Sequence, residues 1–415
     1  MLNYMVKLKL ILLTAVVAGC ASDGAYESRP VPAPQRPIPP VTAPPSLPTP
    51  TPPPQTVRPL PPPAVPVPPT PTPAPNPGER EGRELILRLL PAGIGNRAAW
   101  ATDIHTAFAA LRLRLLPENL CATMAIIEQE STWQADPPVS GLSRIVWQEI
   151  ERRRKKYGVP KIVLDLALQK SSPDGRGYKA RIDALRTENQ VNILYDDMIS
   201  ELPLGKLLLS GYNPVRTGGP MQVGVDFAEE QIRQKPYPYQ RPGSVRNEVF
   251  TRRGGVYFGT AFLLDYPTNY SQMLYRFADF NAGRYSSRNA AFQNAVSRLS
   301  GRALALDGDL LRYKDGVPTG ENSDTLRAIL TLRSRLGLGE TEILRDLKLE
   351  KSIAFENSIL YQRLYALIDA TGERGSRELL PRIDLKSPKI SRQLTTEWFA
   401  RRVDGRYRAC LARAL

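Results

Sequence analysis

Histidine and cysteine are scarce in this chain of 415 residues, which contains one histidine and three cysteines. This scarcity argues against a Ser-His-Asp triad, a Cys-His pair and zinc hydrolysis of the usual kinds, and no spacing typical of metal ligands occurs. We therefore expect no metal and no cofactor. His105 precedes a segment rich in Ala, Leu and Arg that we expect to be helical, and it is predicted to be an ordinary half-buried side chain.

The chain also lacks, at its N-terminus, an apolar run long enough to span a bilayer, because residues 10–17 are too few. Two lysines precede this run and small residues ending in Cys20 follow it, so residues 1–19 have the pattern of a bacterial lipoprotein signal peptide. Acyl chains on Cys20 would anchor the protein. Ala21 is not the aspartate of an inner-membrane retention signal, which favours the outer membrane. The alternative is a secretory signal that happens to end in cysteine.

Prolines are abundant but unevenly distributed, since 24 of the 40 lie between residues 29 and 78. Such a segment cannot bury enough apolar surface to fold and prefers the extended polyproline II conformation. We expect residues 20–78 to be a lipidated cysteine followed by a disordered linker. At about 3.1 Å per residue, its proline-rich part, residues 29–78, would reach on the order of 150 Å. The alternative is a proline-rich ligand for a partner domain.

Residues 79–415 have the pattern of one mainly α-helical body, in which strict strand alternation is scarce. Ser323 is a candidate N-cap, and Gly337 and Gly372 are candidate helix stops. Apolar residues recur at helical spacing within residues 323–337 and 360–372, the segments that end at these glycines. A basic helix is expected to begin near residue 142 and to carry the basic run 152–156. Cys121 and Cys410 are an even pair that can form a disulfide in an oxidising compartment, and the alternative is two unrelated buried thiols.

The body is organised around the stretch Cys121–Trp133, in which an apolar run is followed at once by Glu128 and Glu130. This pattern predicts a buried helix whose last turn carries carboxylates. Carboxylates seldom follow so apolar a run unless they cap it, pair with a partner or do chemistry, and the plain alternative is a solvated helix end. Residues two positions apart on a helix point in directions that differ by about 200° around its axis. We therefore expect Glu128 on a different face from Glu130, paired with an arginine.

Three short motifs follow one another along the chain: Glu130-Ser131, then Gly219-Pro220-Met221-Gln222-Val223, then Phe280-Asn281-Ala282-Gly283. Each is weak alone. In this order they resemble the soluble lytic transglycosylases of the lysozyme-like superfamily, which cleave peptidoglycan glycan strands and carry Glu-Ser, Gly-Leu-Met-Gln-Ile and Tyr-Asn-Ala-Gly. Across the whole body the chain resembles still more closely the YaiW-like outer-membrane lipoproteins, through residues 213–220, 276–281 and 288–293.

The resemblance implies a lysozyme-like helical domain with a long helical insertion at residues 143–218 and a C-terminal helical extension. It also implies that Glu130 is the catalytic acid and Ser131 its hydrogen-bonding neighbour. Asp279 could approach the acid or have a purely structural role. The substrate-binding candidates that the resemblance implies are Ser131, Gly219, Met221, Gln222, Asp279, Asn281 and Gly283.

In such an enzyme the acid works without a second carboxylate. Glu130 would protonate the oxygen between N-acetylmuramic acid and N-acetylglucosamine, the acetamido group would stabilise the developing cation, and the C6 hydroxyl would attack to give a 1,6-anhydro sugar. An acid that is protonated near neutral pH needs a raised pKa, which an apolar wall supplies by desolvation. The candidates for that wall are Ile126, Ile127, Trp133 and Met221.

A formal net charge of +15 suits an anionic partner, and peptidoglycan carries lactyl and peptide carboxylates. We expect the partners to be peptidoglycan glycan strands and the membrane, reached through the anchor at Cys20, and we expect no nucleic acid. An envelope protein is a further candidate partner. The alternative to an enzyme is an accessory lipoprotein that binds glycan, peptide or an envelope protein without cutting, which the insertion, Pro220 and Phe280 favour.

Overall fold

The computed structural model describes residues 77–414, with gaps at 157, 159, 202–212, 214, 242, 315, 373 and 386–393. The predicted signal peptide, Cys20 and the proline-rich linker lie outside the described residues. The described part of the chain is mainly helical, as predicted, and its strands form three antiparallel two-stranded ribbons with two residues in each strand. These ribbons are β1 Thr217–Gly218 with β2 Val223–Gly224, β3 Tyr313–Lys314 with β4 Val317–Pro318, and β5 Asp384–Leu385 with β6 Leu394–Thr395.

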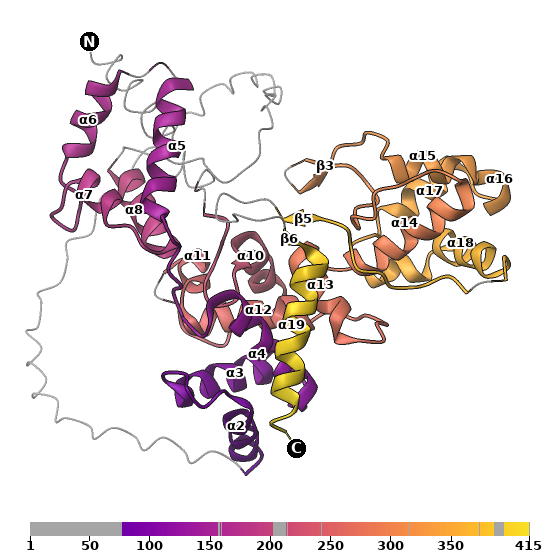
Figure 1. Ribbon diagram of the computed structural model, residues 1–415, viewed down its shortest axis with the longest axis horizontal. Coiled ribbons are helices and arrows are strands. Elements are labelled where there is room, and N and C mark those ends of the chain that lie inside the picture. The colour runs from indigo at the N-terminus through magenta and orange to yellow at the C-terminus, as the bar shows by residue number, and fades with distance from the viewer. Residues whose placement is uncertain are drawn as a thin grey trace, which may run out of the picture. The chain divides into compact units, whose positions relative to one another are not determined.

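The first hydrophobic core joins helices from both ends of the described chain. Helix α4 packs against α12 and α19, α13 packs against α12 and α19, and α3 packs against α2 and α12 (Figure 1). The helices of this core are α2 Pro77–Leu89, α3 Arg97–Leu111, α4 Pro117–Ser131, α10 Val225–Gln234, α11 Val245–Val249, α12 Arg252–Leu264, α13 Met273–Ala282 and α19 Thr396–Leu411.

Helix α4 is the buried helix that the sequence predicts. Pro117 occupies its first turn, where a missing N–H removes no helical hydrogen bond, and every residue from 122 to 127 is buried. A disulfide joins Cys121 of α4 to Cys410 of α19 across 289 residues, so the structure contains a bridge instead of two separate thiols. The C-terminal helix is thereby fixed to the helix that carries Glu130.

His105 lies within α3 and is buried, whereas the sequence analysis placed it before a helix as a half-buried side chain. Its ring lies against Gly82 of α2, where a Cβ atom would come within 3.3 Å of the imidazole. The glycine therefore allows α2 to pack closely on α3. Burial, and next the charge of Arg83, lower the pKa of His105.

The predicted insertion forms its own small hydrophobic core. This core includes Leu142, Ile150, Leu164, Ile182 and Leu194. Helix α5 begins at Leu142 and carries the basic run, as predicted. The helices of this core are α5 Leu142–Lys156, α6 Lys161–Gln169, α7 Tyr178–Asp183 and α8 Glu188–Ser200.

A third core is formed by the segment after α13 and includes Phe292, Leu326, Ile343, Phe355 and Leu364. Its elements are α14 Ser286–Ser300, α15 Asp324–Thr331, α16 Arg333–Leu336, α17 Glu340–Leu347, the 3-10 helix η2 Ile353–Asn357 and α18 Ile359–Asp369.

Ser323 caps α15, accepting a hydrogen bond from the N–H of Leu326, and Gly337 ends α16 in the left-handed conformation, so both predicted signals are confirmed. The predicted continuous segment is divided at Leu332 into two helices. Helix α18 has its C-cap at Ala370, and therefore ends before the predicted stop at Gly372.

Candidate functional site

Glu130 lies in the last turn of α4, and the residues that follow it define where the helix ends. Thr132 and Trp133 have φ values of 50° and 63°, so the backbone leaves the helix abruptly after Ser131. The Trp133 ring meets that of Trp100 edge to face, with centroids 5.3 Å apart. Glu130 itself is partly exposed at this helix end.

Ser131 is buried, and its hydroxyl donates to the carbonyl oxygen of Ile127 at 2.8 Å. The hydroxyl hydrogen is therefore used within α4, which differs from the expected hydrogen bond to Glu130. Glu128 pairs with Arg406 of α19, with Oε1 and Nε 3.6 Å apart. The prediction that Glu128 binds an arginine is confirmed, and this carboxylate strengthens the contact between α4 and α19.

The second motif forms the turn between β1 and β2. Gly219 has a φ of 70°, and a Cβ atom there would lie 2.1 Å from the carbonyl oxygen of Val249. Only glycine therefore fits, since both the backbone conformation and the space exclude a side chain. Gln222 also has a positive φ, 51°, and its side-chain nitrogen donates to the Gly219 oxygen at 3.3 Å. The turn holds Gln222 at a partly exposed position.

The two central residues of this turn pack directly against two glycines of α12. A Cβ atom on Gly255 would lie 2.3 Å from Cδ of Pro220, and one on Gly259 would lie 2.4 Å from the sulfur of Met221. Met221 is fully buried. It therefore anchors the turn on α12 and does not line a surface groove, which corrects the role expected for it.

Asn281 lies in the last turn of α13, beside the start of α19. Its Oδ1 accepts a hydrogen bond of 2.8 Å from the hydroxyl of Thr396, the first residue of α19. The contact orients a partly exposed amide. Sequence reasoning missed Thr396, and no local signal identifies it because the two residues are 115 positions apart.

Asp279 is fully buried and its carboxylate accepts four hydrogen bonds. The donors are the hydroxyls of Tyr266 and Tyr270, at 3.1 and 2.7 Å, and the backbone N–H groups of Tyr285 and Ser287, at 2.8 and 2.7 Å. Burial raises the pKa of Asp279, and the hydrogen bonds from Ser287, Tyr270 and Tyr285 oppose the rise. Of the two roles left open for Asp279, the structural one holds, because it stabilises the turn between α13 and α14.

Gly283 ends α13 with a φ of 108°, and its N–H donates to the Asp279 carbonyl oxygen at 2.8 Å. Phe280 stands where the lytic transglycosylases have tyrosine, and its ring packs edge to face against Phe262 with centroids 5.4 Å apart. The guanidinium of Arg284 lies 5.3 Å from the centre of the Phe262 ring and donates to the carbonyl oxygens of Ala261 and Phe262 at the end of α12. Gly283 and Phe280 thus shape the end of α13.

The three motifs therefore lie on elements that pack around one hydrophobic core. Glu130, Gln222 and Asn281 are partly exposed, whereas Ser131, Gly219, Met221 and Asp279 are buried. The expected apolar wall belongs to the same core, which contains Ile126, Ile127, Trp133 and Met221. One carboxyl and two amides on rigid supports are suited to proton transfer and to hydrogen bonding with a polar, uncharged ligand such as a sugar.

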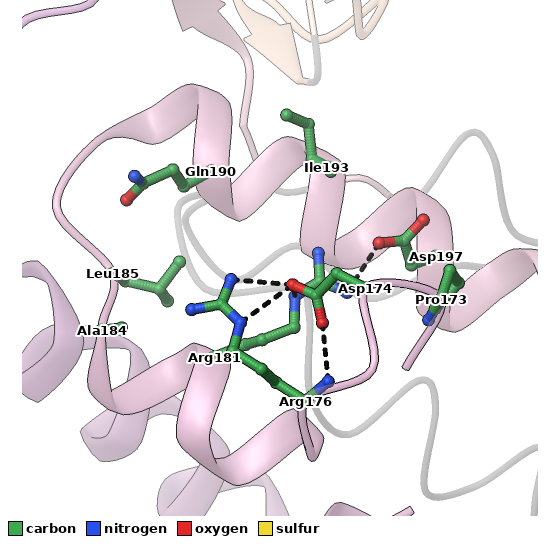
Figure 2. Close-up of a pocket in the computed structure, with 9 residues that line it drawn as sticks. All are labelled: Pro173, Asp174, Arg176, Arg181, Ala184, Leu185, Gln190, Ile193 and Asp197. Carbon is green, nitrogen blue, oxygen red and sulfur yellow. Dashed lines mark hydrogen bonds and ion pairs between the residues drawn. The ribbon is translucent and has the colours of Figure 1, made fainter. Parts of the chain in front are cut away.

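Two hollows lie elsewhere in the described chain. One, in the insertion, has a volume of about 400 Å³ (Figure 2). Its charged groups are already paired, since Arg181 contacts Asp174 and Asp197 at 3.3 and 2.6 Å, and Arg176 contacts Asp174 at 2.7 Å. The other, of about 250 Å³, is polar and lies in the third core beside Gln293. No group of acidic, histidine or cysteine side chains within the described residues is arranged to hold a metal.

The fold and these contacts define a mainly helical protein in which a disulfide joins the C-terminal helix α19 to α4, the helix that carries Glu130. The chain belongs to the family described as "Protein of unknown function (DUF1615)", whose model matches residues 93–413. The protein titled "Uncharacterized protein YaiW" of Escherichia coli (strain K12) is 49% identical over 328 residues, which cover 79% of this chain and 88% of that relative. No solved structure matches. Among the described helices, none is long and apolar enough to cross a membrane.

Proposed function

We propose that this protein is a peptidoglycan lytic transglycosylase with a lysozyme-like helical body, in which Glu130 is the general acid and base. The observation that carries the proposal is that three motifs distant in sequence lie on elements that each pack against α12, namely α4, β2 and α13, and that Glu130, Gln222 and Asn281 are their partly exposed members. The hydrogen bond from Thr396 to Asn281 adds to this support, because it orients an amide at the end of a helix next to α19.

The chemistry requires one carboxyl group. Glu130 gives its proton to the oxygen that links N-acetylmuramic acid to N-acetylglucosamine, and the C1–O bond breaks as positive charge develops at C1. The acetamido oxygen of the same sugar stabilises C1. The C6 hydroxyl then bonds to C1 and returns its proton to Glu130, which closes a 1,6-anhydro ring and restores the acid. Water takes no part as a nucleophile.

The remaining residues bind and orient the glycan. The amides of Gln222 and Asn281 each offer a donor and an acceptor, which suits hydroxyl and acetamido groups. The net charge of +15 attracts the carboxylates of peptidoglycan. An acylated Cys20 in the outer membrane and the proline-rich linker would hold the body at the glycan layer.

The test is digestion of purified peptidoglycan by the mature chain from residue 20 onward, carrying Cys20→Ala so that it stays unlipidated. We expect Glu130→Gln to lower the rate by about 10²–10⁴-fold, because a neutral amide cannot transfer the proton. Glu128→Gln is the matched control on the same helix turn, and it should cleave at close to the parent rate. A Glu130→Gln protein as active as its parent would refute the assignment.

A second candidate function is a binding lipoprotein that grips glycan, peptide or an envelope protein without cutting it. Phe280 favours this candidate, because its ring is packed against Phe262 and supplies no hydroxyl where the lytic transglycosylases have a tyrosine. The same assay separates the two functions. Sedimentation of the parent protein with peptidoglycan in the absence of any cleavage product would support binding alone.

A further inference from the structure

Helix α6 of the insertion presents an apolar pair to solvent. Leu164 and Leu168 point into the core of the insertion, whereas Ile162 and Leu166 are 68% and 63% exposed. These two are among the three most exposed large apolar side chains of the described residues. Because they are four positions apart on one helix, they lie one turn above the other and form a continuous apolar ridge.

Cationic residues flank this ridge in the sequence. Between residues 142 and 170 the sequence has eight lysine and arginine residues against three acidic ones. Lys155 and Lys161 are 71% and 72% exposed at the adjoining ends of α5 and α6, and Lys170, just after α6, is 60% exposed. The one acidic residue on the outer face of α6, Asp165, pairs with Lys161 at 2.6 Å. The segment that carries the apolar pair therefore has an excess of positive charge, in which Lys155 and Lys170 are paired with Glu151 and Glu201.

We propose that the outer face of α6 docks on the surface of an anionic phospholipid bilayer. Ile162 and Leu166 enter the boundary between headgroups and acyl chains, and the lysines bind lipid phosphates. A short helix with exposed apolar side chains on one face and flanking lysines matches the requirements of an interfacial helix, because apolar burial and attraction to anionic lipid act together. The long stems of the lysines can lie along the apolar surface while their ammonium groups reach the phosphates.

Other features of α6 agree with this partner. The ion pairs of Lys155 with Glu151 and of Lys161 with Asp165 are exposed, and exposed pairs are weak enough to exchange for phosphate contacts. The inner face of α6 is fixed by Leu164 and Leu168, so the outer face is presented on a folded support. The proposal concerns α6 and the lysines that flank it, and it stands whether or not Glu130 is catalytic.

The test is co-sedimentation of the unlipidated mature chain, carrying Cys20→Ala, with vesicles of phosphatidylglycerol and phosphatidylcholine or of phosphatidylcholine alone. We expect binding to the phosphatidylglycerol vesicles that weakens as salt is raised, because the cationic contribution is screened. Replacing Ile162 and Leu166 together by serine should weaken binding about tenfold or more, since two buried apolar side chains are lost.

The matched control is Ile359→Ser, which removes another exposed apolar residue, at the start of α18, and should leave binding unchanged. A second variant combines Lys155→Glu and Lys161→Glu, which change exposed side chains only. It should abolish the preference for anionic vesicles. Equal binding of the parent protein to both vesicle types would overturn the proposal, as would unimpaired binding by the serine variant. A parent protein that dimerises through these residues without binding vesicles would assign the ridge to a second copy instead.

Discussion

The carboxyl group of Asp279 lies beneath the surface at which Asn281, two residues later, meets solvent. The same division runs through the other motifs, where Met221 supports Gln222 and Ser131 closes the helix that carries Glu130. Residues adjacent in sequence thus have separate roles. A substitution at a buried member should act through stability, and one at an exposed member through ligand binding or chemistry.

Asp279→Asn tests the structural role at the residue scale. The amide keeps one acceptor oxygen but directs N–H donors toward hydroxyl and backbone donors that now lack a partner. We expect the free energy of unfolding to fall by about 3 kcal/mol, from the loss of hydrogen bonds to a charged group. Urea denaturation measures the change, with Asn281→Asp as an exposed comparison. An Asp279→Asn protein that is fully stable but does not bind glycan would return Asp279 to the ligand site.

His105 offers a direct test of burial in the first core, because it is the only histidine in the chain. Its imidazole resonance in NMR should titrate with a pKa below the ordinary 6.5, since burial disfavours the charged ring. The unfolded state then binds the proton more readily than the folded state. The contribution of neutral His105 to stability is therefore fully present above the pKa of His105 in the unfolded state. It is lost as pH falls below that value toward the pKa in the folded state.

A His105→Gln variant should lack this part of the pH dependence, which urea midpoints measured above and below the unfolded pKa would reveal. A titration midpoint at or above 6.5 would contradict the burial of His105 between α2 and α3.

At the scale of elements, the disulfide connects the two ends of the first core. In the chain-entropy model, a bridge that closes a loop of 289 residues stabilises the folded state by about 6 kcal/mol. Replacing Cys121 and Cys410 together by alanine should lower the urea midpoint accordingly, and adding reductant should lower the midpoint of the parent but not of the double variant. Equal midpoints for the parent with and without reductant would show that the bridge contributes nothing to stability.

Local signals predicted several elements correctly. The apolar run in α4, the N-cap Ser323 and the stop at Gly337 depend only on neighbours in sequence. The break at Leu332 was not predicted, because apolar periodicity continues through it. Counting cysteines left the pair Cys121 and Cys410 as a candidate bridge beside the alternative of two separate thiols, and the structure contains the bridge.

Long-range contacts of the candidate site could not be predicted from the sequence. Nothing near Asn281 indicates that Thr396 donates to it, and nothing near Met221 indicates that Gly259 makes room for its side chain. The burial of Met221 and Asp279 was equally hidden, because a motif gives residue types but not which of them face solvent.

At the scale of the whole molecule, the described chain combines three hydrophobic cores with a basic sequence. The first core carries the candidate site, the insertion has its own core and supports α6, and the third is built from the segment between α13 and β5. Both proposed partners, peptidoglycan and an anionic membrane, would attract this positive charge.

The most direct measurement of the proposed function is the mass of the glycan ends released from peptidoglycan. We expect 1,6-anhydro ends, lighter by one water than reducing ends, from the parent protein, and none from Glu130→Gln. Reducing ends from the parent would mean that water attacks C1 and would contradict the transglycosylase mechanism. Anhydro ends from both proteins would contradict the assignment of Glu130 as the acid.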